Sequence, residues 1–240
     1  MVTHISASQI KTFRSCNKKW WLEKVACVGE RHDTPSTLLG KAVHTAIEEF
    51  FKSNTSLNLS LYPFLKPSLP WLESVKDRVV GVEVEFRERG LFTFETIGYI
   101  DLVLDEGEYI HVIDHKTTKS FYWCKSELEL LSDPQAQLYA LVAYRRYGKP
   151  VRFSHNYICT QAVAEPRLVT CVFKPEEILR AVIKLASTVE QIEAVALIQN
   201  EGAVEPSYDF CNAFGGCPFR TRCDTRPRQD WLSLVGDLYE

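Results

Sequence analysis

Residues 98–116, GYIDLVLDEGEYIHVIDHK, form the stretch from which the fold can be predicted. Two apolar runs, residues 98–104 and 109–113, flank the sequence DEGE, which is typical of a tight turn. The pattern therefore predicts a β-hairpin. Each predicted strand carries an acid where a buried strand ordinarily carries none: Asp101 lies within the first strand, and Asp114 directly follows the second apolar run.

The hairpin also predicts a metal site. Asp114 lies two residues before Lys116, so on a strand their side chains point to the same face. Two carboxylates and one ammonium on adjacent strands either repel one another or bury charge, at a cost on the order of several kcal/mol. A divalent metal ion bound through hard carboxylate oxygens would neutralise the acids.

The composition is that of a globular protein that can bury a substantial core, with 240 residues, 45% hydrophobic and 25% charged. A net charge of -3 argues against a broadly basic DNA-coating protein, but it allows a nuclease, because a metal centre needs acids and phosphate contacts can be local. The first residues form no apolar signal sequence, and no run reaches transmembrane length, so we expect a cytoplasmic protein with no membrane partner.

Two predicted helices carry polar pairs one turn apart. The helix over residues 36–51 places Gly40 and His44 on one face. The helix over residues 134–147, which Pro134 opens, does the same with Gln135 and Tyr139. On their own these patterns carry little information, because a lone helical histidine is more often structural or solvated than a metal ligand.

The strand predicted over residues 80–87 alternates apolar and polar side chains. Its acids Glu83 and Glu85 lie on one face, which is either solvated or turned toward the metal site. Of the two, Glu85 is the candidate ligand because it lies nearer the end of the strand. The Asn-, Ser- and Pro-containing residues 53–70 predict a mobile loop or an insertion.

Eight cysteines in a reducing cytosol more often bind metal than form disulfides. Three of them, Cys211, Cys217 and Cys223, lie close together in the sequence and make an incomplete tetrahedral thiolate site. Cys16 could supply the fourth thiolate, although a single cysteine in a helix is more often a small buried apolar residue.

In chain order, these elements resemble the PD-(D/E)XK nuclease superfamily, in its RecB-like exonuclease branch. The resemblance spans nearly the whole chain and rests on five matches: Gly40-x-x-x-His44, Gly98-x-x-Asp101, Asp114-x-Lys116, Gln135-x-x-x-Tyr139 and the four cysteines. One such match would be weak evidence, whereas five in the expected order are strong evidence.

The resemblance implies a metal-dependent mechanism with Mg²⁺ or Mn²⁺. The implied metal ligands are His44, Glu85, Asp101, Asp114 and the backbone carbonyl of His115. The implied catalytic residues are Asp101, Asp114, Lys116, Gln135 and Tyr139. In these roles Lys116 would assist the nucleophile and offset developing negative charge, while Gln135 and Tyr139 would hold the scissile strand.

For the cysteines, the resemblance implies a 4Fe-4S cluster held by Cys16, Cys211, Cys217 and Cys223, which would join the two ends of the chain. The spacing of the last three cysteines departs from the commoner pattern of the family, in which two of them are only two residues apart. Zinc (Zn²⁺) in the same four thiolates is therefore the alternative.

The expected fold is an α/β nuclease core in which helices flank a mixed β-sheet. We expect five strands, at residues 80–87, 91–104, 109–116, 151–159 and 167–173. We also expect a single nuclease domain over residues 1–240, with residues 1–30 and 205–230 forming the cysteine site.

The implied activity is exonucleolytic hydrolysis of DNA, single-stranded or at duplex ends, in recombination, repair, phage DNA processing or CRISPR adaptation. It would act in a bacterial or phage-infected cytoplasm, with a homo-oligomer or a recombination protein as possible partner. Two alternatives are a catalytically inert DNA-binding or assembly subunit that retains the fold, and a metal-dependent enzyme that acts on another substrate.

Overall fold

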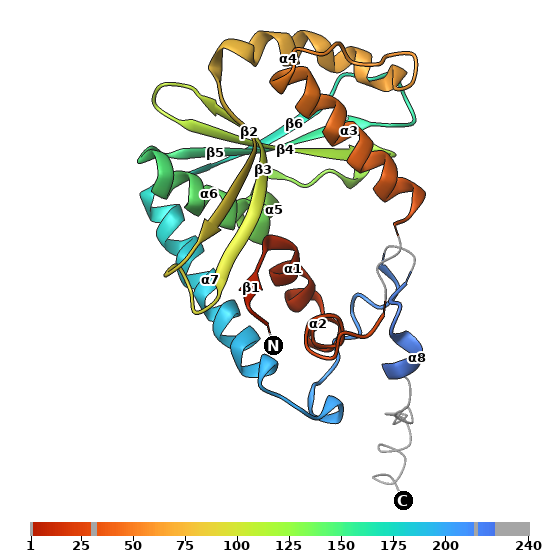
Figure 1. The fold of residues 1–240 in the computed structure, drawn as a ribbon, viewed down its shortest axis with the longest axis vertical. Coiled ribbons are helices and arrows are strands. Elements are labelled where there is room, and N and C mark those ends of the chain that lie inside the picture. The colour runs from red at the N-terminus through yellow and green to blue at the C-terminus, as the bar shows by residue number, and fades with distance from the viewer. Residues whose placement is uncertain (1, 30–32, 214–215, 224–240) are drawn as a thin grey trace, which may run out of the picture.

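A computed structural model describes residues 2–29, 33–213 and 216–223 (Figure 1). Its centre is a six-stranded sheet. The strands are β1 (His4–Ile5), β2 (Val79–Glu88), β3 (Glu95–Asp105), β4 (Ile110–Thr118), β5 (Val151–Cys159) and β6 (Arg167–Phe173). The helices are α1 (Ala7–Ser15), α2 (Asn17–Lys24), α3 (Pro35–Lys52), α4 (Leu69–Val75), α5 (Glu127–Ser132), α6 (Pro134–Tyr147), α7 (Pro175–Ala196) and α8 (Arg220–Cys223). Short 3₁₀ helices cover Pro63–Ser68, Lys76–Arg78, Phe121–Trp123 and Glu201–Ala203.

The sheet is organised around β3. Along one edge, β3 pairs antiparallel with β2. Along the other edge it pairs antiparallel with β4 and, at Glu95 and Thr96, parallel with the short strand β1. From β4 the sheet continues to β5 in parallel and then to β6 antiparallel. A parallel pair requires a crossover connection, and α5 and α6 supply it between β4 and β5.

Helices cover both faces of the sheet (Figure 1). Neighbouring residues of β4 show the alternation, because Val112 packs in the core shared with α1, α6 and α7, whereas Ile113 packs on the side of α4. The larger core includes Phe13, Trp20, Leu138, Leu141, Phe153 and Leu185. The core under α3 and α4 includes Val43, Ile47, Leu65 and Leu72. The expected architecture of a mixed sheet flanked by helices is confirmed.

Local sequence explains where α6 begins and ends. Asp133 caps the helix, since its Oδ1 accepts hydrogen bonds from the backbone N–H groups of Gln135 at 2.8 Å and Ala136 at 3.3 Å. Pro134 follows at the first helical position, as predicted. Gly148 ends the helix with φ of +67°, a conformation that glycine adopts without steric cost.

One prediction about the elements was wrong. The sequence predicts a strand from residue 91, but β3 begins at Glu95. Residues 53–70, predicted as a mobile loop or an insertion, contain a 3₁₀ helix and the start of α4. Leu57 and Leu65 from this segment are buried in the same core as Val43 of α3, so its apolar residues hold it against the sheet.

Part of the predicted cysteine subregion, residues 224–230, lies outside the described residues. Within the described part of the chain, no helix combines the length and the apolar character needed to cross a membrane.

Candidate active site

Strands β3 and β4 diverge at the two acids that the hairpin pattern singles out. The ladder between the two strands ends at the pair of Leu102 and Ile113. Beyond that pair β4 stays beside β5, whereas β3 stays beside β2. The backbone N–H of His115 then donates to Asp101 Oδ2 at 2.7 Å, so a carboxylate closes the base of the opening. We call this divergence the fork.

One group of possible metal ligands gathers at the fork: His44 of α3, Glu83 of β2 and Asp101 of β3. A ligand atom from each lies within 4.8 Å of those from the other two. His44 Nδ1 is 3.3 Å from Asp101 Oδ2. Carboxylate oxygens with one imidazole nitrogen are suitable donors for a divalent cation. The donor set therefore fits the Mg²⁺ or Mn²⁺ ion that the sequence predicts.

Glu83 reaches this group through a strained backbone. The strand pairs on either side of it place Glu83 opposite Asp101. Its φ is +48°, in the left-handed region that residues other than glycine rarely adopt. Residues two apart on a regular strand share a face, but here they do not. Val82 packs on the side of α4, whereas Val84 packs on the side of α6.

Glu85, the ligand that the sequence predicts from this strand, lies elsewhere. Its carboxylate pairs with Arg87 at 3.1 Å, and half of its side chain is exposed. The structure thus brings Glu83, not Glu85, to the other acids. A period-two pattern places both glutamates on one face, and the change of backbone conformation at Glu83 is invisible in it.

The crowded acids have altered protonation. Burial, reinforced by Asp114, raises the pKa of Asp101 well above its usual range. Burial and the neighbouring Glu48 raise the pKa of Glu83. Burial also lowers the pKa of His44, against the opposing effect of Asp114. Each shift favours the uncharged form, so the group resists ionisation unless a cation is present.

Asp114 lies on the side of the fork that faces α6. Its Oδ1 accepts a hydrogen bond from Gln135 Nε2 at 2.6 Å, and its Oδ2 forms an ion pair with Lys116. Lys116 Nζ also donates to Gln135 Oε1 at 3.2 Å. Although burial lowers the pKa of Lys116, the Asp114 carboxylate outweighs it and raises that pKa above its ordinary value. The ammonium therefore stays charged beside the carboxylate.

Tyr139 lies one turn beyond Gln135 and is buried, and burial raises the pKa of its hydroxyl. Its ring packs edge-on against Phe86 of β2, with centroids 5.7 Å apart. Phe86 in turn covers Gly98, where an added Cβ would lie 2.5 Å from the phenyl ring. The glycine that precedes Asp101 by three residues is thus needed for packing next to Tyr139.

The side chain of His115 points away from Asp114, toward α3 and α4. Its ring lies edge-on to those of His44 and Trp71, with centroids 6.1 and 6.4 Å away. Burial, helped by His44, lowers the pKa of His115 to about 3, so its imidazole is neutral. A backbone hydrogen bond joins His44 to His115, which brings the carbonyl predicted as a metal ligand next to the His44 ring.

A cavity of about 510 Å³ opens in the fork beside Lys116. The residues that line it are Ser6, Ala7, Ser8, Lys11, Ile97, Gly98, Tyr99, Lys116, Gln135 and Tyr139. Strand β1 takes the edge of β3 only at Glu95 and Thr96, which leaves the following residues of β3 to line this opening. Sequence reasoning missed Lys11, Ser6 and Ser8, because a serine before a helix is an ordinary capping residue and gives no sign of a site.

The PD-(D/E)XK nuclease superfamily model matches this chain over residues 4–67 and 61–224. The chain belongs to this superfamily. No sequence among the curated proteins matches it.

Solved structures with similar folds include a chain from Eubacterium rectale named "Putative exonuclease", with a TM-score of 0.55 and 16% identity. That comparison covers 98% of this chain and 92% of the other, and at such identity it shows the fold alone. SSO0001 has a TM-score of 0.49 and 15% identity, over 95% of this chain and 89% of that one. The alkaline exonuclease LHK-Exo from Laribacter hongkongensis has a TM-score of 0.36 and 10% identity, over 80% and 89% of the two chains.

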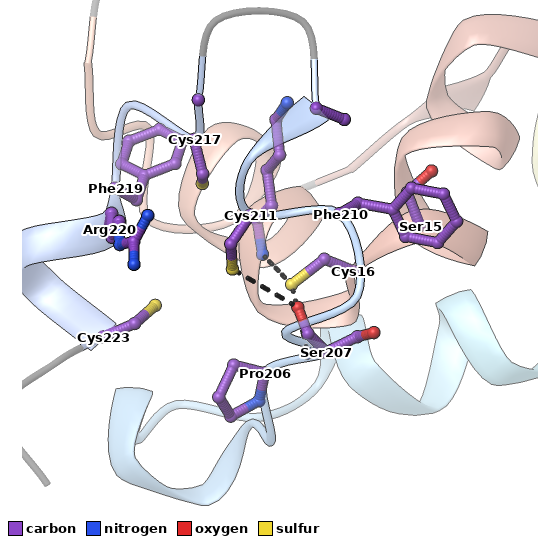
Figure 2. Close-up of a pocket in the computed structure, with 13 residues that line it drawn as sticks. Ser15, Cys16, Pro206, Ser207, Phe210, Cys211, Cys217, Phe219, Arg220 and Cys223 are labelled. Carbon is purple, nitrogen blue, oxygen red and sulfur yellow. Dashed lines mark hydrogen bonds between the residues drawn. The ribbon is translucent and has the colours of Figure 1, made fainter. Parts of the chain in front are cut away.

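The four cysteines predicted as ligands surround a second cavity in this PD-(D/E)XK chain, of about 170 Å³. Figure 2 shows the sulfur atoms of Cys16, Cys211, Cys217 and Cys223 turned toward the space between them. Cys16 lies where α1 ends and α2 begins. Cys211 and Cys217 come from the segment that leads into α8, and Cys223 is the last residue of α8.

The backbone supports a sulfur ligand at Cys16. Its Sγ accepts hydrogen bonds from the backbone N–H groups of Lys19 and Ser207, each at 3.4 Å. Such donors stabilise a thiolate at the start of a helix. Burial and then the neighbouring thiols of Cys16 and Cys217 raise the pKa of Cys223, because thiolates held this close repel one another. A bound cationic group would remove that repulsion.

Proposed function

We propose that this chain is a divalent-metal-dependent deoxyribonuclease of the RecB-like branch, with exonuclease action as its favoured mode. One observation carries the proposal: the fork holds the group of His44, Glu83 and Asp101, and Asp114, which forms the ion pair with Lys116, lies near enough to act electrostatically on each of the three. The α6 helix adds Gln135, which hydrogen-bonds to both members of that pair and so lies at the site where the resemblance implies that it holds the scissile strand.

Mg²⁺ or Mn²⁺ is the cofactor that these donors fit. His44, Glu83 and Asp101 would hold it, and Asp114, which lies outside that close group, and the carbonyl of His115 would complete the site. When bound, the ion would lower the pKa of a water molecule and stabilise charge on the attacked phosphate. Lys116 keeps an ammonium beside this position, where it can offset developing negative charge.

The substrate is proposed to be a DNA strand that enters the fork cavity. Lys11 and Lys116 supply ammonium groups to this cavity, and Ser6 and Ser8 supply hydroxyls. These are the groups that contact phosphate oxygens in nucleic-acid complexes. Because ammonium–phosphate contacts release counterions, we expect binding to weaken as salt rises. The name of the Eubacterium rectale chain supports exonuclease action.

The test is cleavage of end-labelled duplex, linear single-stranded and covalently closed circular DNA with Mg²⁺ or Mn²⁺. We expect digestion of linear DNA, loss of digestion in Asp114→Ala and retention in Glu108→Ala, which removes an exposed acid of the hairpin turn. Cutting of the closed circle would replace the exonuclease proposal with an endonuclease. Absence of cleavage with metal present, together with retained DNA binding, would favour the inert subunit instead.

We also propose that the four cysteines hold a 4Fe-4S cluster, so that the whole chain acts as a single nuclease domain. Tetrahedral zinc, with Zn–S distances of about 2.3 Å, needs sulfur atoms about 3.8 Å apart. Among the described residues, the His44, Glu83 and Asp101 group is the only set of three or more ligands within 4.8 Å of one another, so no three of these sulfurs are that close. The wider spacing of the sulfur atoms supports a bound group larger than one zinc ion, such as a 4Fe-4S cluster.

Elemental analysis of protein isolated without oxygen tests the cluster. We expect about four iron atoms for each chain and absorption in the near-visible region, both lost in Cys217→Ser. One zinc atom and no iron would replace the cluster with the alternative site, and absence of both metals would refute a metal at these cysteines.

A further inference from the structure

A row of buried, hydrogen-bonded polar side chains lies on β5, beside Asp114 and Lys116 of β4. The mechanism proposed above does not use it. Strand β5 pairs in parallel with β4 so that His155 is the partner of Asp114 and Tyr157 is the partner of Lys116. Partners across a ladder share one face of the sheet. Each charged side chain of β4 therefore has a polar ring beside it, and both rings are almost fully buried, with 3% and 6% exposed.

The hydrogen bonds along this row run in one direction. The backbone N–H of Lys125 donates to Tyr157 Oη at 3.1 Å. Tyr157 Oη lies 2.9 Å from His155 Nδ1, and these are its two hydrogen-bond partners among the described residues. If Nδ1 carried a hydrogen, the phenol oxygen would accept twice and its own hydrogen would have no acceptor among the described residues. The arrangement that satisfies every group therefore has the phenol donating to Nδ1 and the imidazole hydrogen on Nε2.

That Nε2 faces Asp114. It lies 3.7 Å from Asp114 Oδ2, is buried, and makes no hydrogen bond with any described residue. A buried N–H group without a partner is costly, and the Asp114 carboxylate, 3.7 Å away, is the acceptor that a small shift of the ring would bring within hydrogen-bond distance.

The row closes into a ring through α6. The side chain of Lys125 pairs with Asp133, which caps α6 at Gln135. Gln135 Nε2 donates to Asp114 Oδ1, the oxygen on the other side from His155. Both oxygens of the carboxylate thus face donors that belong to one connected network, which restrains its rotation.

We propose that His155 is a positioning residue that holds the Asp114 carboxylate through its Nε2–H, with Tyr157 setting the orientation of the imidazole. The proposal rests on the proposed function in treating Asp114 as a metal ligand. Partners of this kind, which orient a ligand without touching the ion, typically change metal affinity or activity about 10- to 100-fold when they are replaced.

The first test is nuclear magnetic resonance of the histidine side chains, with ¹⁵N labelling, in protein free of metal. We expect the His155 proton on Nε2. In Asp114→Asn, which removes the anionic acceptor, we expect the resonance of this proton to move upfield. A His155 proton on Nδ1, or a resonance that is unchanged in Asp114→Asn, would overturn the proposal.

The second test is the affinity for Mn²⁺, measured without DNA. We expect His155→Leu and Tyr157→Phe each to weaken binding about tenfold, and the double variant to be no worse than His155→Leu. His155→Gln, which keeps an amide donor, should restore most of the affinity. Where DNA cleavage is measured, kcat should fall while KM changes little.

His111→Leu is the matched control. His111 is also a buried histidine, 6% exposed, but it bonds to Ser154 and Glu106 in the half of β4 that precedes the fork. Equal loss of Mn²⁺ affinity in His111→Leu and His155→Leu would show a general effect on folding and refute a positioning role. If the wild type binds no Mn²⁺, the proposed function fails, while the magnetic resonance still tests the contact of His155 with Asp114.

Discussion

Glu83 and Glu85 are two acids of one strand with different environments. Glu83 lies with His44 and Asp101, whereas Glu85 pairs with Arg87 in solvent. We expect Glu83→Gln to weaken Mn²⁺ binding at least about tenfold, since it replaces a ligand, not merely a supporting residue. Calorimetric titration measures this affinity.

Glu85→Gln provides the control, because it makes the same chemical change two residues away. Loss of a solvent-exposed ion pair is worth about 0–1 kcal/mol, so stability and Mn²⁺ affinity should hardly change. If Glu85→Gln bound Mn²⁺ more weakly than Glu83→Gln, Glu85 would be the ligand, as the sequence predicts.

The raised pKa of Asp101 gives the metal-free protein a specific pH dependence. Folding favours the protonated form of Asp101. Its contribution to the free energy of unfolding is therefore fully present below the unfolded pKa of about 3.9, and it is lost as pH rises through the higher pKa of the folded protein. Asp101→Asn has no carboxyl group to ionise, so its stability does not fall in this way. The difference in unfolding free energy between Asp101→Asn and wild type should therefore grow from pH 4 to pH 7.

Chemical unfolding in EDTA measures that difference. Saturating Mn²⁺ at pH 7 should reverse the ranking, because the ion stabilises the wild type by binding its ionised acids. A difference that stays constant from pH 4 to pH 7 would contradict the assignment of a raised pKa to Asp101.

At the scale of elements, two glycines of the motifs have different roles. Gly98 of β3 lies under Phe86, so a methyl group there would overlap the ring at 2.5 Å. Gly40 of α3 has only Thr117 nearby, at 3.4 Å from an added Cβ. We expect Gly98→Ala to destabilise the fold by about 1–3 kcal/mol through overpacking. Gly40→Ala should be neutral or stabilising, since alanine is the better helix former.

Thermal unfolding of the two glycine variants measures this contrast. Phe86 also packs on Tyr139, so Gly98→Ala should reduce DNA cleavage as well, whereas Gly40→Ala should retain it. Equal stability of the two variants would mean that Phe86 moves aside without cost, and would remove the packing explanation for Gly98.

Across the whole molecule, segments far apart in the sequence meet at the cysteine cavity. Trp21 Nε1 donates to Ile198 O at 2.9 Å, and the Lys18 ammonium donates to Glu201 O, so α2 is held to the segment after α7 by bonds independent of the thiols. The cluster would add to these bonds. We expect Cys16→Ser to lose the iron and lower the unfolding temperature, because metal binding is coupled to folding.

Cys27→Ser is the control for that variant, since Cys27 is exposed and lies outside the cysteine cavity. It should keep both the iron and the unfolding temperature. The loss in Cys16→Ser should also add to any effect of Asp114→Ala, because distant sites contribute independently. Identical unfolding temperatures for Cys16→Ser and Cys27→Ser would rule out a structural role for the site.

Sequence spacing alone determined much of this protein. The turn between two apolar runs predicts the hairpin, and a two-residue interval places Asp114 and Lys116 on one face, where they form an ion pair. Helical spacing likewise puts Gln135 and Tyr139 on one face of α6. These predictions succeed because the direction of a side chain within one regular element depends only on local geometry.

Only the tertiary structure decided which acids meet. The divergence of β3 from β4, the left-handed backbone at Glu83 and the placement of His155 beside Asp114 all depend on pairing between distant strands. The cavity between β3, β4, α1 and α6 likewise needs four elements at once. Spacing along a chain says which face a residue occupies, but it says neither where a ladder ends nor which side chains burial brings together.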